Sequence, residues 1–313
     1  MKDNIKLAAI VIWFNPETIG LKKIIENIKS YSTYIDKVYI VDNSPIKHRE
    51  LSTNIENSFY IFNNNKGGIA GAQNLGWKKA QEDGFEWIMT MDQDSFFEPG
   101  QFVAYRSKVI EYISCNEKGV CFGPRINDLN EKKYLTKQIR YHILSPIKRL
   151  LFKLINKNWK PAELPDVEIN RNLIASANIV KISILTLVNG YDEKLFIDQV
   201  DFDLCNKIKC IGYETVRFNT VYLNQIYGDK NFFAFIKPKA FYSQFRFYYI
   251  IRNHVILAAR YQALSKIFNK ELKELYFQYC VFSLKAFSNK KIFEKAKKDA
   301  LTFLEEEKQG INL

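Results

Sequence analysis

The sequence predicts an α/β fold in which a mainly parallel sheet is flanked by helices and followed by a helical C-terminal region. The first reason is the apolar run at residues 7–14, whose length suits a strand buried on both faces. The second is the alternation of similar runs with helical patterns, which is typical of a doubly wound sheet. The third is size, because 313 residues that are 47% hydrophobic can bury a large core.

The elements of the first half follow in chain order. Asn15 and Pro16 end the first strand, and residues 17–30 carry Ile and Leu at helical spacing. The further expected elements are strands at residues 37–41, 59–62 and 87–91, and a helix opened by glycines at residues 70–80. Acidic residues follow two of these strands directly. Because ligands of such sheets bind beyond the carboxyl ends of the strands, we expect the functional site at that edge.

The second half is less regular. The expected elements are strands at residues 120–124 and 173–180, a helix at 181–188, and a helix from 196 to about 210 with Gly212 as its C-cap. From residue 242 onward the pattern is helical. No stretch reaches the ~18 apolar residues of a membrane-spanning helix.

The cellular compartment is indicated by the cysteines and by the start of the chain. Five cysteines occur without a CxxC pair, which predicts a reduced protein with buried thiols. A charged start leads into a short apolar run with no small-residue cleavage site, so no signal peptide is expected. Together these features predict a cytoplasmic protein.

The net charge of +12 is concentrated in two segments. Residues 131–160 hold nine Lys/Arg and one Glu, and residues 230–313 hold sixteen Lys/Arg and seven Asp/Glu, so the rest of the chain is net acidic. This balance excludes an acidic solvating protein. It leaves nucleic acid, an anionic membrane or a phosphorylated substrate as partner classes.

The strongest local motif lies at residues 91–95. Asp92 and Asp94 flank one residue directly after a buried strand. Such a pair can hold a hard divalent cation, which prefers oxygen ligands and can neutralise a diphosphate. The alternative is a turn or a helix N-cap, where Asp is also common.

A glycine-rich stretch at residues 65–76 is the second motif. Its glycines permit close approach of backbone to a ligand, and a helix N-terminus there favours an anion. The spacing fits neither a Walker A loop nor GxGxxG. The alternative is a turn followed by close helix packing.

An acidic segment is the third motif. Five carboxylates lie within twelve residues, at Asp192, Glu193, Asp198, Asp201 and Asp203. One of them could remove a proton from a sugar hydroxyl, since a general base in a cleft is usually a carboxylate or His. The alternative is a solvated helix start, which favours acidic side chains.

Together these motifs resemble the inverting family 2 glycosyltransferases of the GT-A fold, and within them the bacterial rhamnosyltransferase-like branch. The matching stretches are residues 11–16, 41–44, 65–76, 91–94, 189–201 and 246–253. The resemblance covers about residues 7–262 and implies a Rossmann-like, mixed but mainly parallel sheet flanked by helices.

The resemblance implies a role for each matching residue. Asp201 aligns with the catalytic base, with Asp198 and Asp203 as weaker candidates. Asp94 matches the direct metal ligand, and Asp92 matches a second ligand nearer the ribose. The residues implied in nucleotide binding are Trp13, Asn15, Asp42, Asn43, Lys66, Gly67, Gly68, Asn74 and Asp92, of which Asp42 would contact the base.

Mg²⁺ or Mn²⁺ is the implied cofactor. Many relatives have a His after the base helix that completes the metal site, but Gln225 stands there in this chain. The three histidines, His48, His142 and His254, lie elsewhere. The resemblance therefore leaves open a weaker metal site or a reaction without metal.

The implied activity is transfer of a sugar from a nucleotide diphosphate to a hydroxyl group with inversion. The branch favours L-rhamnose from dTDP-rhamnose, a lipid-linked or polysaccharide acceptor, and a place in cell-surface polysaccharide biosynthesis. Two alternatives remain: a UDP-hexose donor on the same machinery, and a non-catalytic nucleotide-sugar-binding protein on the same fold.

We expect residues 1–230 to form the catalytic domain, with a basic amphipathic insertion at about 131–160, and residues 231–313 to form a helical, aromatic and basic region. In the insertion, residues 147–157 have the pattern of an interfacial membrane helix. Both basic segments predict contact with an anionic membrane at its inner, cytoplasmic face. The alternatives are helices packed on the sheet, or a homodimer through the C-terminal helices. Nucleic acid is rejected because no RNP-like or helix-turn-helix pattern accompanies the charge.

Overall fold

A computed structural model of the chain describes residues 5–129, 164–170, 172–225, 242–281 and 285–310. Within them, eight strands form one sheet in the order β3-β2-β1-β4-β7-β5-β8-β6. The strands are β1 (Leu7–Trp13), β2 (Lys37–Asp42), β3 (Ser58–Phe62), β4 (Trp87–Asp92), β5 (Gly119–Asp128), β6 (Val167–Ile169), β7 (Asn178–Lys181) and β8 (Glu214–Gln225). β7 runs antiparallel to its neighbours β4 and β5, and β6 is antiparallel to β8, whereas the other pairs are parallel. The predicted mixed, mainly parallel sheet is confirmed.

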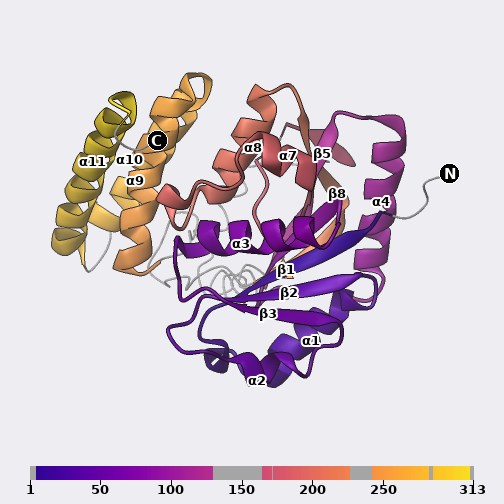
Figure 1. Cartoon of the computed structure of the whole chain (residues 1–313). Helices are drawn as coiled ribbons and strands as arrows, with labels where there is room; N and C mark the ends of the chain where they lie inside the picture. Colours follow the sequence, from indigo (N-terminus) through magenta and orange to yellow (C-terminus); the bar gives the residue numbers. More distant parts are fainter. Residues whose placement is uncertain (1–4, 130–163, 171, 226–241, 282–284, 311–313) are drawn as a thin grey trace, which may run out of the picture.

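Helices cover both faces of this sheet (Figure 1). They are α1 (Leu21–Ser32), α2 (Arg49–Ser52), α3 (Gly68–Glu82), α4 (Gln101–Cys115), α7 (Ile182–Leu187), α8 (Val200–Cys210), α9 (Gln244–Arg260), α10 (Ser265–Tyr276) and α11 (Ala286–Lys308). Alternate residues of β1 belong to separate cores: Ile10 packs on the side of α3, α7 and α8, and Val11 packs on the side of α1 and α4. The apolar run at residues 7–14 therefore contains a strand buried on both faces, as predicted.

Local backbone geometry explains where the observed bounds differ from the expected ones. A 3₁₀ turn at Pro16–Thr18 and a positive φ at Gly20 delay α1 to Leu21. Of the strand expected at 173–180, only its end pairs, as β7. The helix expected from residue 196 begins at Val200, because a segment of left-handed backbone precedes it. β6, β8 and α4 had not been predicted.

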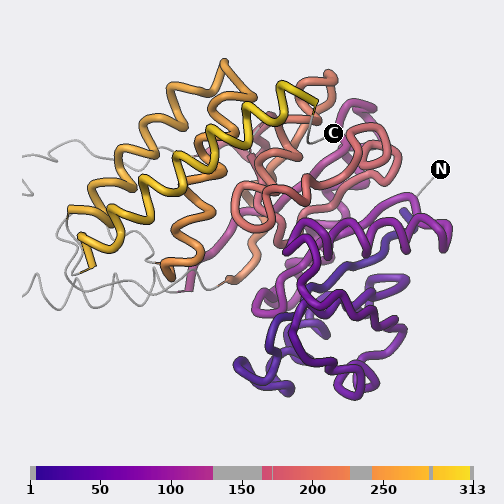
Figure 2. The backbone as a smooth tube through the Cα atoms, turned by 60° about the vertical axis from the view of Figure 1, so that its left-hand side comes forward, coloured from indigo at the N-terminus to yellow at the C-terminus, as the bar shows by residue number. Residues whose placement is uncertain are grey.

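The C-terminal helices α9, α10 and α11 pack side by side and lie against the α3 face of the sheet (Figures 1 and 2). Ile256 and Leu257 of α9 join the core cluster that contains Ile10, which attaches these helices to the sheet layer. No helix among the described residues is long and apolar enough to cross a membrane. The basic insertion at 131–160 lies outside the described residues, so its predicted membrane helix stays a prediction.

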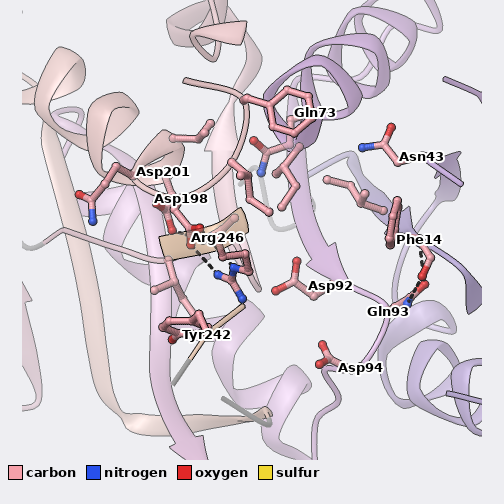
Figure 3. A pocket seen from close by; sticks show the side chains of 18 of the residues that line it. Phe14, Asn43, Gln73, Asp92, Gln93, Asp94, Asp198, Asp201, Tyr242 and Arg246 are labelled. Carbon is pink, nitrogen blue, oxygen red and sulfur yellow. Dashed lines mark hydrogen bonds and ion pairs between the residues drawn. The ribbon is translucent and has the colours of Figure 1, made fainter. Parts of the chain in front are cut away.

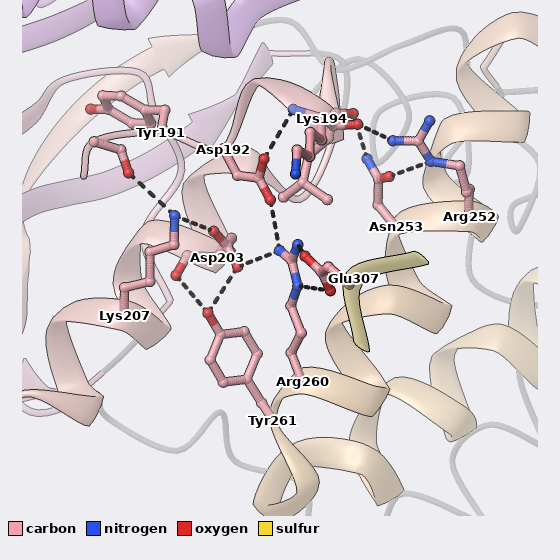
Figure 4. Close-up of polar contacts among 12 residues, drawn as sticks. Tyr191, Asp192, Lys194, Asp203, Lys207, Arg252, Asn253, Arg260, Tyr261 and Glu307 are labelled. Atoms are coloured by element: carbon pink, nitrogen blue, oxygen red, sulfur yellow. Dashed lines mark hydrogen bonds and ion pairs between the residues drawn. The ribbon is translucent and has the colours of Figure 1, made fainter. Parts of the chain in front are cut away.

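An ionic cluster joins α9 to the acidic segment at residues 192–203 (Figure 4). Arg260, at the end of α9, pairs through Nη1 with Asp192 at 2.8 Å and with the fully buried Asp203 at 3.4 Å, and through Nη2 with Glu307 of α11. Tyr261 donates its hydroxyl to Asp203 at 2.8 Å. The cluster thus connects the acidic segment at residues 192–203 to helices α9 and α11.

We predict that Arg260→Met lowers the free energy of unfolding by about 2–4 kcal/mol, because the substitution removes the guanidinium shared by three carboxylates and leaves the buried Asp203 paired with Lys207 alone among the described residues. Urea titration followed by circular dichroism measures this. Lys79→Met is the control, since the half-buried Asp83 that pairs with Lys79 keeps Lys37 and Tyr39 as partners, so the substitution should change stability much less. Equal losses in the two variants would contradict the structural role given to Arg260.

Candidate functional site

A cavity of about 710 Å³ opens at the carboxyl ends of β1 and β4. Its wall is built from the ends of these strands, from α3, from the start of α8 and from the start of α9 (Figure 3). The lining includes four carboxylates, Asp92, Asp94, Asp198 and Asp201, and one cationic side chain, Arg246. The site therefore lies at the edge that the sequence predicts, but it also includes residues beyond 230.

Asp92 and Asp94 meet at the end of β4, as the motif predicts. The side chain of Gln225 donates a hydrogen bond through Nε2 to Asp92 Oδ2 at 2.8 Å. Burial raises the pKa of Asp92, and burial together with the negative charge of Asp92 raises the pKa of Asp94 to about 6. A divalent cation would relieve this repulsion. The described residues contain no group of three or more His, Cys, Asp or Glu that could hold a metal by themselves.

The glycine-rich stretch packs against the segment that leads into α8. Gly68 has φ of 63°, and a Cβ there would lie 2.3 Å from the carbonyl oxygen of Phe196. The amide of Ile69 donates to the same oxygen at 2.8 Å. Phe196, Asp198 and Gln199 themselves have φ of 65°, 61° and 66°, a conformation that costs non-glycine residues energy. Close helix packing, the alternative reading of the glycines, is thus part of their role.

Asn253 of α9 holds this strained segment in place. Its side chain is fully buried, and Nδ2 donates to the carbonyl oxygens of Leu195, Ile197 and Asp198 at 2.8–2.9 Å. The neighbouring Arg252 donates to the carbonyl oxygen of Lys194. Because α8 begins directly after this segment, α9 fixes the position of the first turn of α8.

Asp201 lies in that first turn and faces the cavity. Its carboxylate accepts hydrogen bonds from the backbone amides of Ala175 at 3.0 Å and Phe202 at 2.9 Å. Burial raises the pKa of Asp201 to about 7, with the charge of Asp198 adding to the effect and the backbone hydrogen bonds opposing it. A carboxyl group with such a pKa can take up a proton near neutral pH.

The two other carboxylates beside Asp201 are engaged by cations. Asp198 pairs with Arg246, whose Nε lies 3.2 Å from Oδ2, and Arg246 also lies over the ring of Tyr242 at 4.3 Å (Figure 3). Asp203 points away into the cluster around Arg260 and does not line the cavity. Of the three candidates, Asp201 is the carboxylate that lines the cavity without an ion pair among the described residues.

The structure divides the residues predicted to bind the nucleotide into two groups. Asn43 and Asp92 line the cavity. The following lie nearby but outside the lining: Trp13, Asn15, Asp42, Lys66, Gly67, Gly68 and Asn74. Their contact with a nucleotide stays a prediction.

Two of the nearby side chains are engaged within the protein. Asp42 is fully buried and accepts hydrogen bonds from Ser44 and Tyr60. Burial opposes the ionised form of Asp42, but these hydrogen bonds outweigh it and hold its pKa below the usual value. Asn74 donates to the carbonyl oxygen of Tyr191 and to Glu193, which links α3 to the acidic segment.

Sequence reasoning missed Arg246, Tyr242 and Gln73 as lining residues. The stretch 246–253 was matched to the family, yet its aromatic and basic composition indicated a surface segment. Gln73 lies inside the glycine-rich motif, but other residues of that motif were predicted to bind the ligand. The local sequence holds no signal for this role, because the burial of Gln73 is visible only in the structure.

A family model described as Glycosyl transferase family 2 matches residues 9–170. The chain belongs to this family. It is therefore a transferase of glycosyl groups, and the match spans the strands that carry Asp42, Asp92 and Asp94. A curated relative, the dTDP-rhamnosyl transferase RfbF of Shigella flexneri, is 27% identical over 260 residues, which are 81% of this chain and 80% of the relative. This relative supports the rhamnosyltransferase-like resemblance.

Solved glycosyltransferase structures share the fold. TarS of S. aureus, residues 1–349 in complex with UDP-GlcNAc, matches with a TM-score of 0.57 and 15% identity over 95% of this chain and 80% of that chain. GalNAc-T7 with UDP, GalNAc and Mn²⁺ matches with a TM-score of 0.52 and 12% identity over 72% of this chain and 45% of that chain. At these identities the likeness concerns the fold alone, and the GT-A fold expected for family 2 is confirmed.

We predict that Asp201→Asn stabilises the protein in a pH-dependent way. The pKa of Asp201 rises from 3.8 to about 7 on folding, so the folded state binds a proton that the unfolded state has lost. The free energy of unfolding of the wild type therefore falls between about pH 4 and 7, and Asn removes this loss. The stability difference between variant and wild type should grow over that range and stay constant above it. Thermal melts at pH 4 to 8 measure it.

Glu111→Gln, at an exposed position on α4, controls for the loss of one negative charge. If the stability gain of Asp201→Asn over the wild type is no larger at pH 8 than at pH 4, burial does not control the ionisation of Asp201.

Proposed function

We propose that this family 2 enzyme transfers a sugar from a nucleotide diphosphate to an acceptor hydroxyl group with inversion, and that L-rhamnose from dTDP-rhamnose is the donor. The observation that carries the proposal is the position of Asp92 and Asp94 in the same cavity as Asp201. The first pair suits a diphosphate with its cation, and Asp201 suits an acceptor hydroxyl. The RfbF relative is named a dTDP-rhamnosyl transferase, which supports the sugar and the base.

The side chains at the end of β4 fit Mg²⁺ or Mn²⁺. Burial raises the pKa of both Asp92 and Asp94, and the negative charge of Asp92 adds to the effect at Asp94, so a cation bound here would favour the ionised carboxylates. Gln225 orients Asp92, and its Oε1 is buried without a partner among the described residues, so it offers a further oxygen ligand. A bound cation would neutralise the charge that develops on the diphosphate leaving group. GalNAc-T7, which shares the fold, was solved with Mn²⁺.

Asp201 performs the proton transfer in this proposal. Its carboxylate takes the proton of the acceptor hydroxyl while the hydroxyl oxygen attacks the anomeric carbon, and the bond from that carbon to the diphosphate oxygen breaks. One displacement inverts the configuration, so no enzyme nucleophile is required. A pKa of about 7 leaves a large fraction of Asp201 ionised at neutral pH while keeping it basic enough to accept the proton.

The acceptor is proposed to be a lipid-linked or polysaccharide glycan of cell-surface biosynthesis. Two alternatives compete with the full proposal. A UDP-hexose could replace dTDP-rhamnose, or the chain could bind a nucleotide sugar without catalysis. The three possibilities are distinguished by which nucleotide sugar is used as donor and by whether substitution of Asp201 lowers turnover.

We predict that dTDP-rhamnose, in a panel with UDP-hexoses, binds most tightly and is hydrolysed or transferred in the presence of Mg²⁺ or Mn²⁺. Asp201→Asn should keep nucleotide-sugar binding and lower turnover about 10²–10⁴-fold, because the base is lost. Asp94→Ala should weaken the dependence on metal and lower turnover. Calorimetry and product assays measure binding and turnover.

Glu111→Gln serves here as the charge-matched control for Asp201→Asn. Unchanged turnover in Asp201→Asn would remove Asp201 from the role of base. Binding without turnover in the wild type would favour the non-catalytic alternative.

We further propose that one end of the C-terminal helices contacts an anionic membrane. Phe277, Val281 and Phe287 are 56%, 46% and 76% exposed near the junction of α10 and α11. Lys290 and Lys291 are exposed on the same part of α11, and Lys291 lies 4.7 Å over the ring of Phe287. Aromatic and cationic side chains in this combination suit the headgroup region of a membrane.

We predict that the full chain sediments with vesicles containing anionic phosphatidylglycerol at low salt, and that Phe277→Ser with Phe287→Ser weakens this binding several-fold. Leu301→Ser, at a 55% exposed site further along α11, is the control. If the chain binds neutral vesicles as well as it binds anionic ones, the membrane proposal is wrong. The proposal is also wrong if the wild type forms a concentration-dependent dimer that the double variant abolishes. That result would show that this surface binds a second copy of the chain.

A further inference from the structure

Three glutamine side chains of the cavity carry buried polar atoms without a partner among the described residues. Gln73 has none at either Oε1 or Nε2, and Gln199 and Gln225 have none at Oε1. Gln73 lies in α3 and is 1% exposed. It is the only one of the three in which the whole carboxamide is unsatisfied. None of them was among the predicted site residues.

An unpartnered carboxamide at this depth destabilises the folded protein. Burying an amide without hydrogen bonds costs free energy, and native proteins rarely keep such a group without a use for it. The residue one turn earlier on α3, Ile69, also lines the cavity and is apolar. Figure 3 shows the carboxamide of Gln73 on the cavity side of α3. A ligand that fills the cavity therefore lies next to Gln73, and the side chain must turn slightly toward it because its polar atoms are buried.

The chemistry of the carboxamide restricts that ligand. Oε1 accepts a hydrogen bond and Nε2 donates one. Phosphate oxygens of an ionised diphosphate only accept, so they would leave Oε1 unsatisfied. A hydroxyl group both donates and accepts, so neighbouring hydroxyl groups can satisfy the whole carboxamide.

The position of Gln73 indicates which hydroxyl groups these are. Gln73, Asp92 and Asp201 line the same cavity, and Figure 3 shows them on different sides of it. Under the proposed function, the diphosphate lies at Asp92 and the acceptor oxygen at Asp201, so the transferred sugar must occupy the space between them.

We propose that Gln73 binds hydroxyl groups of the transferred sugar and so contributes to the choice of donor. The proposal rests on the proposed function. A buried group that hydrogen-bonds a hydroxyl rejects sugars that lack the hydroxyl or place it differently, since binding them leaves the carboxamide unsatisfied. On this proposal the contacts of Gln73 are with the sugar, and the nucleotide part of the donor binds elsewhere in the cavity.

The test compares the full chain with its Gln73→Met variant, which keeps the length of the side chain and removes its polar atoms. Calorimetry measures the affinity for dTDP-rhamnose and for dTDP, or for UDP-hexose and UDP if the wild type prefers uridine. We expect the affinity for the nucleotide sugar to fall about 10- to 100-fold, and the affinity for the nucleoside diphosphate to change less than about twofold. The unfolding midpoint should stay the same or rise, because the variant removes an unsatisfied amide.

Gln81→Met is the matched control, because Gln81 is exposed on the same helix and bonds to Thr186. Equal affinities of Gln73→Met and wild type for the nucleotide sugar would overturn the proposal. So would an equal loss for the nucleoside diphosphate, which would place the base at Gln73, or a lower unfolding midpoint, which would show a structural role. If the wild type binds no nucleotide sugar, the proposed function fails, and the role of Gln73 falls with it.

Discussion

The hydrogen bonds from Asn253 to the backbone of residues 195–198 are the contact on which the candidate site depends. Three residues between 196 and 199 adopt left-handed backbone angles, each at a cost of about 1–3 kcal/mol. Such a segment persists only where its surroundings specify it, and here α9 specifies it through buried donors. Asp198, the first turn of α8 and thus Asp201 take their positions from this contact. The ionic cluster at Arg260 secures the far end of the same helix.

Much of the fold could be predicted from local sequence, because buried strands and amphipathic helices have distinct periods. Residues 7–13 are apolar throughout, and the run at 87–91 contains only one polar residue, Thr90, so their burial on both faces follows from composition. The bounds near residues 173–200 could not be predicted, since they depend on long-range contacts. β7 is defined by its pairing with β4 and β5, and the start of α8 is delayed by a backbone that α9 stabilises.

Site residues that belong to one short motif could be predicted from the sequence. Site residues that the fold brings together from distant segments could not. Asp92 and Asp94 are separated by one residue in sequence, and Asp201 stands in a segment rich in carboxylates, which left three candidates. Only tertiary structure separates them, because Arg246 engages Asp198 and Arg260 engages Asp203. Gln73 and Arg246 line the cavity through packing of distant elements, and their local sequence carries no sign of it.

The entry of α9 into the cavity wall has a consequence for how such enzymes diversify. A C-terminal extension that only attached the enzyme to a surface could be exchanged between relatives while the chemistry stayed the same. Here Tyr242, just before α9, and Arg246, in its first turn, line the cavity, and the middle of α9 supplies Asn253 to the segment before Asp201. Recombination at residue 230 would therefore alter the shape of the cavity and the position of the acidic segment together. The two halves of this chain are expected to evolve as one unit.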